Sequence, residues 1–342
     1  MEERIETEFQ LEDILSRPSN EDVASLRMLS GNLLILGVGG KMGPSLAHRA
    51  ARAAREAGGG CKIIGVSRFS NPKAREALEA AGVATIAADL LDSDQLDALP
   101  EADNVIFMAA RKFGSTGDES LTWAMNAWLP SQVARRYRQA RIVAFSSGNI
   151  YPFTPVASGG ATEETPVGPV GEYAQSVLAR ERMFEYFSRL YGTKVVMLRL
   201  NYAVEPRYGV LVDLGQKVYE GRPVDLTMGY ANVIWQGDAN SVCLRSFAVA
   251  ESPPYILNLT GPETLRVRDI AAEFGQRFGV EPVFEGTEAE TALLNNASRC
   301  HAMFGPPSVS VSRLIDWTAH WIQHGGSLLG KPTHFEARDG KF

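Results

Sequence analysis

The chain has 342 residues, which corresponds to about two domains on a scale of roughly 150 residues each. Hydrophobic residues make up 45% and charged residues 22%, so the collagen-like, low-complexity and wholly disordered classes are excluded. The 34 basic and 40 acidic residues give a net charge of -6, which argues against a surface that coats nucleic acid. We therefore expect a folded protein with no nucleic-acid partner.

The cysteine, histidine and apolar patterns exclude several kinds of site. Cys61, Cys243 and Cys300 are far apart, and this spacing predicts neither a disulfide framework nor a zinc site. The five histidines form no metal-ligand grouping. The first ten residues are acidic where a secretory signal is basic, and no run approaches the roughly 18 apolar residues of a membrane span. We predict a cytoplasmic protein that binds no metal and no membrane.

Short apolar runs alternate with helical patterns from Asn32 onward. The expected strands cover 33–36, 63–66, 84–87, 105–108, 142–145 and 195–200. The expected helices cover 46–57, 72–81, 93–98, 119–139 and 172–191. Pro130 should kink or end the fourth of these helices, because proline cannot continue the hydrogen-bond ladder. Strands that alternate with helices predict an α/β fold with a parallel sheet.

Glycines recur every third residue after the first expected strand, at Gly37, Gly40 and Gly43. Such a turn lets backbone N–H groups and a helix N-terminus approach a pyrophosphate, which side chains at these positions would block. The turn lies between a strand and a helix, which is the context that a dinucleotide-binding motif requires. We predict that these glycines, with Lys41 and Met42 between them, bind a dinucleotide cofactor.

The second expected strand ends in Ser67-Arg68, where dinucleotide folds that prefer NAD carry an acid for the ribose hydroxyls. A guanidinium can hold a 2′-phosphate, so we expect NADP rather than NAD, unless Arg68 is only a solvated loop residue. Asp89 and Leu90, after the third strand, are expected beside the adenine.

These patterns divide the chain into four parts. We expect a helical extension over 1–30, a Rossmann-type doubly wound parallel sheet over 31–205 and a smaller α/β substrate lobe over 206–330, part of which returns to the sheet. The remaining residues, 331–342, are polar and expected to be loosely held. In the extension, a second helix should start at Ser19 or Asn20. Further expected elements are a strand at 255–259 and helices at 267–278 and 312–324.

Several further segments carry a family resemblance, which extends over about residues 32–325. They are 105–110, Asn126, Ser146–Tyr151, Tyr173, Arg199 with Pro206, 235–238, Asn258 and Gly261. Together with the glycine turn, they resemble the extended short-chain dehydrogenase/reductase family, in particular its NAD-dependent epimerase/dehydratase branch. The resemblance implies that Tyr173, Ser147 and Asn126 are catalytic, and that Ala109, Ala110 and Tyr173 contact the cofactor. A tyrosine hydroxyl can remove the proton of an alcohol as hydride leaves the carbon, provided that its pKa is lowered.

One position departs from the family. A lysine follows the family's tyrosine by four residues, and its charge lowers the tyrosine pKa. Val177 stands there in this chain and can neither lower that pKa nor bind the cofactor ribose. Lys112 or Arg111 could substitute, whereas Arg180 is two helical turns from Tyr173 and is expected to be too far away.

The substrate side of the site is less well defined. Tyr202 and Glu205 also differ from the family's usual residues, which suggests an altered pocket. We expect Lys112, Asn149, Tyr202 and Arg207 to contact substrate.

Three functional readings remain open at this point. The first is an NAD(P)-dependent oxidoreductase or epimerase that acts on a sugar, sugar acid or nucleotide sugar. The second is a non-catalytic NAD(P)-binding sensor or regulator that has lost the lysine, and the third is a cofactor-free scaffold. The family resemblance also implies a homodimer in which the helices at 119–139 and 172–191 pair with a second copy.

Overall fold

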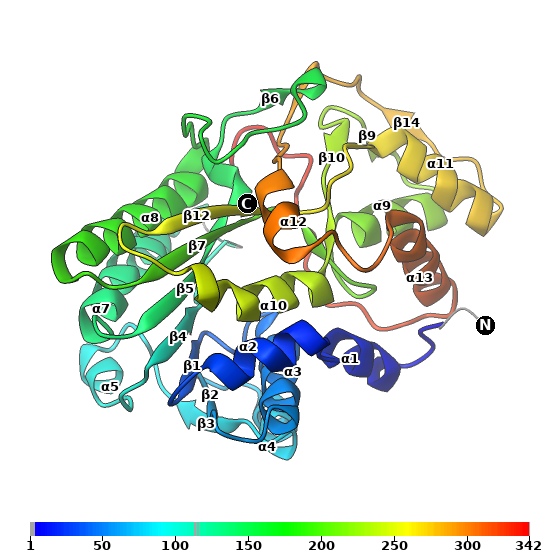
Figure 1. Cartoon of the computed structure of the whole chain (residues 1–342). Coiled ribbons are helices and arrows are strands. Elements are labelled where there is room, and N and C mark those ends of the chain that lie inside the picture. The colour runs from blue at the N-terminus through cyan, green and yellow to red at the C-terminus, as the bar shows by residue number, and fades with distance from the viewer. Residues whose placement is uncertain (1–3, 113, 115, 342) are drawn as a thin grey trace.

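A computed structural model describes residues 4–112, 114 and 116–341 of the chain. Its centre is a parallel sheet of seven strands in the order β12-β7-β5-β4-β1-β2-β3 (Figure 1). The strands are β1 (Leu33–Leu36), β2 (Ile63–Ser67), β3 (Ala84–Ala87), β4 (Asn104–Phe107), β5 (Arg141–Ser147), β7 (Val195–Leu200) and β12 (Tyr255–Leu259). Each of these strands was expected from the sequence, and the doubly wound parallel sheet is confirmed.

The strand order fixes where a ligand can bind. The chain starts in the middle with β1, moves outward to β3, and then returns to place β4 on the other side of β1. Loops after β1 and β4 therefore leave in opposite directions, which opens a crevice at the carboxyl ends of these strands. The glycine turn follows β1 directly, so it lies at this crevice.

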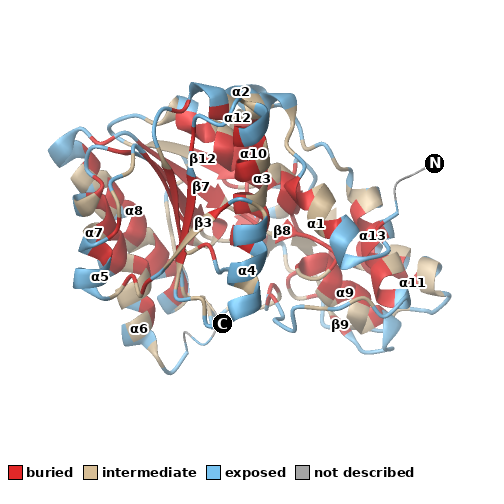
Figure 2. Cartoon of the chain, turned by 90° about the horizontal axis from the view of Figure 1, so that it is seen from below, coloured by how far each residue is buried: buried red, intermediate tan, exposed pale blue. Residues whose placement is uncertain are grey.

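Helices cover both faces of the sheet (Figure 2). One face packs against α3 (Gly43–Glu56), α4 (Pro72–Ala80) and α10 (Gln236–Arg245), and the other against α5 (Ser93–Asp97), α7 (Leu129–Arg136) and α8 (Gly171–Tyr191). Successive side chains of β1 pack on opposite faces of the sheet. Leu33 and Ile35 belong to the apolar core under α3, and Leu34 and Leu36 to the core under α7 and α8.

The helix expected at 119–139 is interrupted. It consists of α6 (Glu119–Trp123), a π-helical turn (Ala124–Trp128) and α7. The Leu129 N–H bonds the Ala124 carbonyl five residues back, and Pro130 occupies the first turn of α7. Proline has no N–H to donate, so the irregularity falls just before it rather than after it. This π turn carries Asn126.

A second lobe packs beside the carboxyl ends of the strands. Its helices are α9 (Val210–Tyr219), α11 (Val267–Phe278) and α13 (Val311–Gln323), which share an apolar core. Short strand pairs brace it, namely β9 (Val224–Asp225) with β14 (Phe284–Glu285), and β10 (Tyr230–Ala231) with β13 (Leu265–Arg266). Two further strand pairs and one helix lie between the two lobes. The pairs are β8 (Ala203–Val204) with β11 (Ile234–Trp235) and β6 (Thr154–Pro155) with β15 (Thr291–Ala292), and the helix is α12 (Ser298–Phe304).

The segment after Gly330 is anchored, so the expectation that it is loosely held was wrong. Thr333 donates from its backbone N–H and its hydroxyl to Asp213, at 2.7 and 2.6 Å. Phe335 is 2% exposed in the core of the second lobe, and the Arg338 guanidinium bonds Thr291 at 2.7 Å. A buried aromatic ring and two satisfied polar groups offset the entropy that ordering this polar segment costs.

The N-terminal segment forms α1 (Glu8–Ser16) and α2 (Asn20–Met28), and Ser19 caps the second helix as expected. Asp22 in α2 is fully buried and pairs with Arg49 of α3 at 2.6 Å, while the Ser241 hydroxyl of α10 donates to it at 2.6 Å. A buried carboxylate with these partners fixes α2 across α3 and α10, because any other position would leave the charge unpaired.

Candidate functional site

A cavity of about 700 Å³ opens at the carboxyl ends of β1, β4 and β5, where the sheet meets the second lobe. The residues around it come from the glycine turn, the loop after β4, the end of β5, the start of α8, the segment after β7 and the C-terminal segment. This is the crevice that the strand order predicts for a ligand.

The structure gathers about half of the predicted site residues at the surface of this cavity. Those that line it are Gly40, Lys41, Met42, Ala110, Lys112, Ser147, Asn149, Tyr173, Tyr202 and Arg207. Those that lie outside its lining are Gly37, Gly43, Ser67, Arg68, Asp89, Leu90, Ala109 and Asn126.

The glycine turn leaves no room for side chains. A Cβ at Gly37, whose φ is +93°, would lie 2.6 Å from the backbone nitrogen of Ala109. At Gly43 it would lie 2.1 Å from the carbonyl oxygen of Val38, which allows α3 to start against the strand. No side chain caps the N-terminus of α3, so its N–H groups face the turn. These residues fit the pyrophosphate of a dinucleotide.

The residues predicted to bind the adenosine end lie along the neighbouring strands. A Cβ at Gly39 would lie 2.4 Å from the Ser67 hydroxyl, so this serine abuts the glycine turn. Arg68 follows it and is exposed. The Asp89 carboxylate accepts a hydrogen bond from the Leu91 N–H at 3.0 Å, and Leu90 is buried. Ser67 and Arg68 thus lie at the end of β2, and Asp89 and Leu90 lie after β3, while their contact with an adenosine stays a prediction.

Ser147 and Tyr173 meet at the wall of the cavity. Their side chains share a hydrogen bond, and the Ser147 hydroxyl also donates to the Asn149 side chain at 3.0 Å. Burial raises the pKa of the Tyr173 hydroxyl, whereas the positive charge of Arg180 and the hydrogen bond to Ser147 lower it. Ser147 and Tyr173 are therefore 26 residues apart in the sequence, but the fold brings their side chains into contact.

Val177 occupies the position of the family's lysine as part of an apolar cluster. It is completely buried and packs with Ile150, Tyr151, Ala161 and Tyr173. A lysine ammonium in this cluster would lose its hydration without gaining a partner, so the cluster favours an apolar side chain such as valine.

Arg180 lies close enough to Tyr173 for its charge to lower the pKa of the Tyr173 hydroxyl, so the expectation that it is too far away was wrong. Its guanidinium lines the cavity and donates to the Phe145 carbonyl at 2.7 Å and to the Asn126 amide oxygen at 2.8 Å. Helical side chains tilt toward the N-terminus of their helix, and arginine is long enough to bridge the two turns back to Tyr173. Burial lowers the pKa of Arg180 to about 10, which leaves it charged at neutral pH.

Asn126 holds Arg180 in place from behind the cavity wall. It is fully buried, and its side-chain nitrogen donates to the Arg111 carbonyl at 2.8 Å and to the Ser176 hydroxyl at 3.0 Å. Its oxygen accepts from the Arg111 N–H at 3.0 Å as well as from Arg180. The π turn therefore ties the loop after β4 to α8. Arg111 itself pairs with Asp118 at 2.9 Å.

Two lysines predicted for the site enter the cavity from the sheet side. The Lys112 ammonium lies 3.3 Å from the Thr333 carbonyl oxygen and 5.8 Å from the centre of the Tyr173 ring. The Lys41 ammonium lies 3.3 Å from the centre of the Tyr208 ring. Burial is the largest cause that lowers the pKa of Lys112 to about 8 and that of Lys41 to about 7.

Tyr202 and Glu205 shape the side of the cavity that faces the second lobe. Tyr202 lines it with a backbone φ of +47°, a left-handed conformation that costs energy for a tyrosine. Glu205 lies behind the lining, and burial raises the pKa of its carboxyl group while Arg207 opposes that rise.

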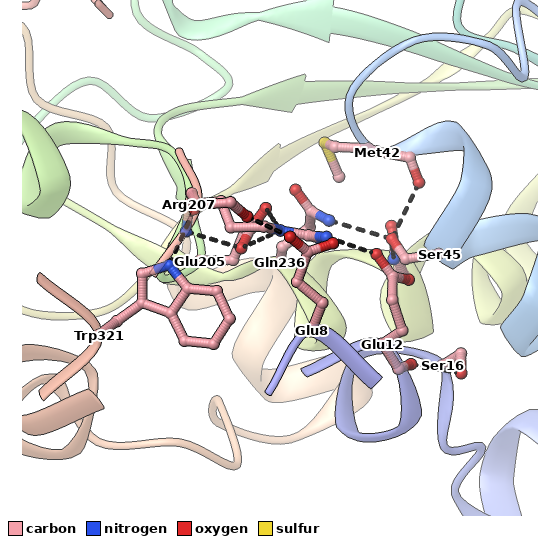
Figure 3. A network of polar contacts seen from close by, with 11 residues as sticks. Glu8, Glu12, Ser16, Met42, Ser45, Glu205, Arg207, Gln236 and Trp321 are labelled. Carbon is pink, nitrogen blue, oxygen red and sulfur yellow. Dashed lines mark hydrogen bonds and ion pairs between the residues drawn. The ribbon is translucent and has the colours of Figure 1, made fainter. Parts of the chain in front are cut away.

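The N-terminal segment contributes Glu12 to the cavity lining, and this residue belongs to a network of polar contacts (Figure 3). Glu12 of α1 pairs with Arg207 at 2.7 Å, and the same guanidinium pairs with Glu205 at 3.0 Å. Nearby, Gln236 donates to the Ser45 hydroxyl at 3.0 Å, which in turn donates to the Met42 carbonyl at 3.1 Å. Glu12 thus fixes a predicted substrate residue, which gives the extension a place in the site.

Several residues that line the cavity were not placed there from the sequence, among them Glu12, Arg180, Tyr208, Lys331 and Thr333. Lys331 and Thr333 belong to a segment whose polar composition predicted a loose end. Glu12 is distant in sequence from every motif. For Arg180, the length of an arginine side chain and its tilt toward the N-terminus of the helix could have indicated that it reaches Tyr173.

Comparison with known proteins gives the family. The model of the NAD dependent epimerase/dehydratase family matches residues 33–227, which is more than half of the chain. The chain therefore belongs to this family, as the sequence motifs implied.

Individual relatives are more distant. Residues of this chain are 34% identical to Protein YeeZ of Escherichia coli K12 over 115 residues, which is 34% of this chain and 39% of YeeZ. The chain thus spans well under half the length of this curated relative.

Solved structures of similar fold include three from bacteria. Pal from Bacillus thuringiensis superposes with a TM-score of 0.71 at 18% identity over 85% of this chain and 99% of Pal. A UDP-glucose 4-epimerase of Thermotoga maritima gives 0.69 at 17% identity over 86% and 99% of the two chains. A dTDP-glucose 4,6-dehydratase of Bacillus anthracis, solved with NAD, gives 0.70 at 16% identity over 86% and 97%. At these identities the likeness shows a shared fold.

The structure also bears on metals, cysteines and membrane contact. Among residues 4–112, 114 and 116–341, no three histidine, cysteine, aspartate or glutamate side chains gather in a way that could hold a metal ion. Cys61, Cys243 and Cys300 are free and buried. In the same described part of the chain, no helix has both the length and the apolar character that crossing a membrane requires.

Proposed function

We propose that the protein is an NAD(P)-dependent oxidoreductase or epimerase that transfers hydride at a hydroxyl-bearing carbon of a sugar, sugar acid or nucleotide sugar. The observation that carries the proposal is the hydrogen-bonded pair of Ser147 and Tyr173, which faces a cavity bordered by the glycine turn. A bound nicotinamide cofactor would supply the hydride acceptor and donor.

The chain's own residues would manage the proton in this reaction. The Tyr173 hydroxyl, once ionised, accepts the proton of the substrate hydroxyl as hydride leaves the adjacent carbon. The Ser147 hydroxyl donates a hydrogen bond to the same substrate oxygen and orients it. Without substrate this hydroxyl donates to the Asn149 side-chain oxygen at 3.0 Å, so it must exchange that partner for the substrate oxygen, while the Asn149 backbone N–H still donates to the Ser147 oxygen at 3.2 Å. The reverse transfer returns the proton from Tyr173 to the oxygen.

Arg180 takes over the electrostatic role that the family gives to lysine. Its buried guanidinium favours the ionised form of Tyr173, and it is held by Phe145 and Asn126. In this proposal Asn126 is a positioning residue that acts through Arg180. In this proposal position 177 needs no charged side chain, because Arg180, two helical turns after Tyr173, supplies the positive charge.

A non-catalytic NAD(P)-binding sensor or regulator is the second candidate. It is favoured by the apolar cluster around Val177, in which the family's lysine has no counterpart. The two candidates differ in turnover. An enzyme converts at least one member of a panel of sugars, sugar acids and nucleotide sugars, whereas a sensor binds the cofactor and converts none.

The cofactor preference follows from the end of β2. Arg68 is exposed there and no acid precedes it, so we propose that NADP binds more tightly than NAD. Arg68→Gln should weaken NADP binding about tenfold, because one charge-assisted contact to the 2′-phosphate is lost. NAD binding should stay unchanged, and isothermal calorimetry with both cofactors measures the ratio. Equal affinity of the natural protein for both cofactors would contradict the preference.

We also propose a cytoplasmic homodimer that acts on a small carbohydrate-like substrate. Exposed apolar side chains gather on the helices that the family resemblance assigns to a dimer contact, namely Trp123, Trp128, Tyr186, Leu190 and Tyr191. Such patches mark protein contacts. A monomeric mass in light scattering would contradict the dimer, and recovery in a membrane or periplasmic fraction would contradict the location.

A further inference from the structure

Two carboxylates converge on the guanidinium of Arg207 at the wall of the cavity (Figure 3). Glu12 accepts a hydrogen bond from its Nη1 at 2.7 Å, and Glu205 accepts from its Nε at 3.0 and 3.1 Å. Glu205 also accepts from the backbone N–H of Arg207 at 2.9 Å. One positive charge therefore faces two acidic groups, so these three side chains together have no excess positive charge.

Both acidic groups act on the charge of Arg207. Burial lowers the pKa of Arg207, but the charges and hydrogen bonds of Glu205 and Glu12 outweigh burial and raise that pKa above its usual value. Burial is the largest cause that raises the pKa of Glu205, and the negative charge of Glu12 adds to it, against the effect of Arg207. The fold thus holds two carboxyl groups that repel each other at one guanidinium, whose charge is compensated before any ligand arrives.

The N-terminal helix α1 holds Glu12 in this position. Leu11 and Leu15 are completely buried in the core of the second lobe, and Asp13 pairs with Arg52 of α3 at 2.8 Å. Glu12 lies between these anchors, so its backbone is held against both lobes. It precedes the part of the chain that the family model matches, so the motifs of the family carry no information on this contact.

One nitrogen of the Arg207 guanidinium remains for a ligand. In the described part of the chain its Nη2 forms no hydrogen bond, and Arg207 lines the cavity with 12% of its side chain exposed. The N–H groups of Nη2 can donate to a ligand oxygen. An anion at this nitrogen would also meet the negative charges of Glu12 and Glu205, whereas an uncharged hydroxyl or carbonyl oxygen meets no such repulsion.

We propose that Glu12 is a positioning residue that acts through Arg207. Together with Glu205 it cancels the positive charge of Arg207, so that this wall of the cavity binds an uncharged oxygen of the substrate and rejects an anionic group. This role rests on the proposed function, in which the cavity is the substrate site. The N-terminal helix thereby takes part in substrate selection through a repulsive element as well as an attractive one.

Calorimetry with inorganic phosphate tests the role of Glu12 on the full chain saturated with NADP, so that the glycine turn is occupied. Glu12→Gln removes one negative charge and keeps the length of the side chain. We expect phosphate to bind about tenfold more tightly to this variant than to the natural protein, because one repulsive charge is lost. Damage to the structure alone would not produce such a gain.

Three further variants assign the gain to Arg207. Asp13→Asn is the matched control, because Asp13 is the next residue of α1 and pairs with Arg17 and Arg52 instead. Its loss of the same charge should change phosphate affinity by less than about twofold, since solvent screens an exposed charge. Addition of Arg207→Gln to Glu12→Gln should abolish the gain. Glu12→Leu makes the same change of charge with a residue that favours helix, and it replaces Glu12→Gln if that variant does not fold.

Three results would contradict this role of Glu12: unchanged phosphate affinity in the folded Glu12 variant, an equal gain in Asp13→Asn, or a gain that persists without Arg207. The proposed function fails separately, because none of these measurements depends on turnover. A protein that shows the gain through Arg207 but never transfers hydride refutes catalysis and leaves Glu12 as a determinant of what the cavity binds.

Discussion

Replacement of Tyr173 by phenylalanine should lower kcat by about a thousandfold, which lies within the range for loss of a general acid–base group. The change removes one hydroxyl from a ring that packs in the apolar cluster with Ile150, Tyr151 and Val177. Phenylalanine preserves that packing, so the fold should stay unchanged, and the cofactor affinity should fall by no more than the contribution of one hydrogen bond, about tenfold or less. Steady-state turnover on the best substrate of the panel, with cofactor affinity from calorimetry, measures both quantities.

Tyr186→Phe provides the control for this variant. Tyr186 lies on the same helix and is 58% exposed, so its hydroxyl has no part in the site. Turnover of that variant should equal that of the natural protein. A Tyr173→Phe variant that keeps full turnover would remove Tyr173 from the mechanism and leave the sensor reading in its place.

Replacement of Arg180 by glutamine should move the pH profile of kcat to higher pH by about one unit or more. Tyr173 must be ionised to accept a proton, so activity rises with pH up to the pKa of its hydroxyl. Burial raises that pKa, and the Arg180 charge and the Ser147 hydrogen bond lower it. Without the guanidinium the pKa rises, and at neutral pH kcat should fall about tenfold per unit.

A purely structural role would give a different result for Arg180. It would lower stability or kcat at every pH without moving the profile, whereas Arg180→Lys should restore much of the shift because it restores a charge. Arg182→Gln is the matched control, since Arg182 lies on the same helix at 56% side-chain exposure. An unshifted profile in Arg180→Gln would exclude Arg180 as the replacement for the missing lysine.

The central sheet was predictable because its strands are short apolar runs buried on both faces. The bounds 84–87, 195–200 and 255–259 agree with the structure at both ends. Interruption of the helix at 119–139 was expected at Pro130, but the form it takes, a π turn that carries Asn126, depends on the contacts of that residue with Arg180 and Ser176. The helix propensity of each residue gives no information on hydrogen bonds between side chains that are far apart in the sequence.

The cofactor side of the site was easier to predict than the substrate side for a physical reason. Phosphate binding needs glycines at fixed spacing within one turn, and this spacing is visible in a sequence. The cations that line the cavity include Lys41, Lys112 and Lys331, which are far apart in sequence and meet through tertiary packing alone. The anchoring of Lys331 depends on Phe335 and Thr333, whose partners lie in the second lobe.

The most direct test of hydride transfer without the family's lysine is a single-turnover experiment. Protein loaded with oxidised cofactor is mixed rapidly with each member of the sugar, sugar-acid and nucleotide-sugar panel, and the fluorescence of reduced nicotinamide is followed. We expect reduced cofactor to form with at least one member of the panel, and to be absent in Tyr173→Phe. Cofactor that binds tightly but is reduced by no member of the panel would contradict catalysis and favour a sensor.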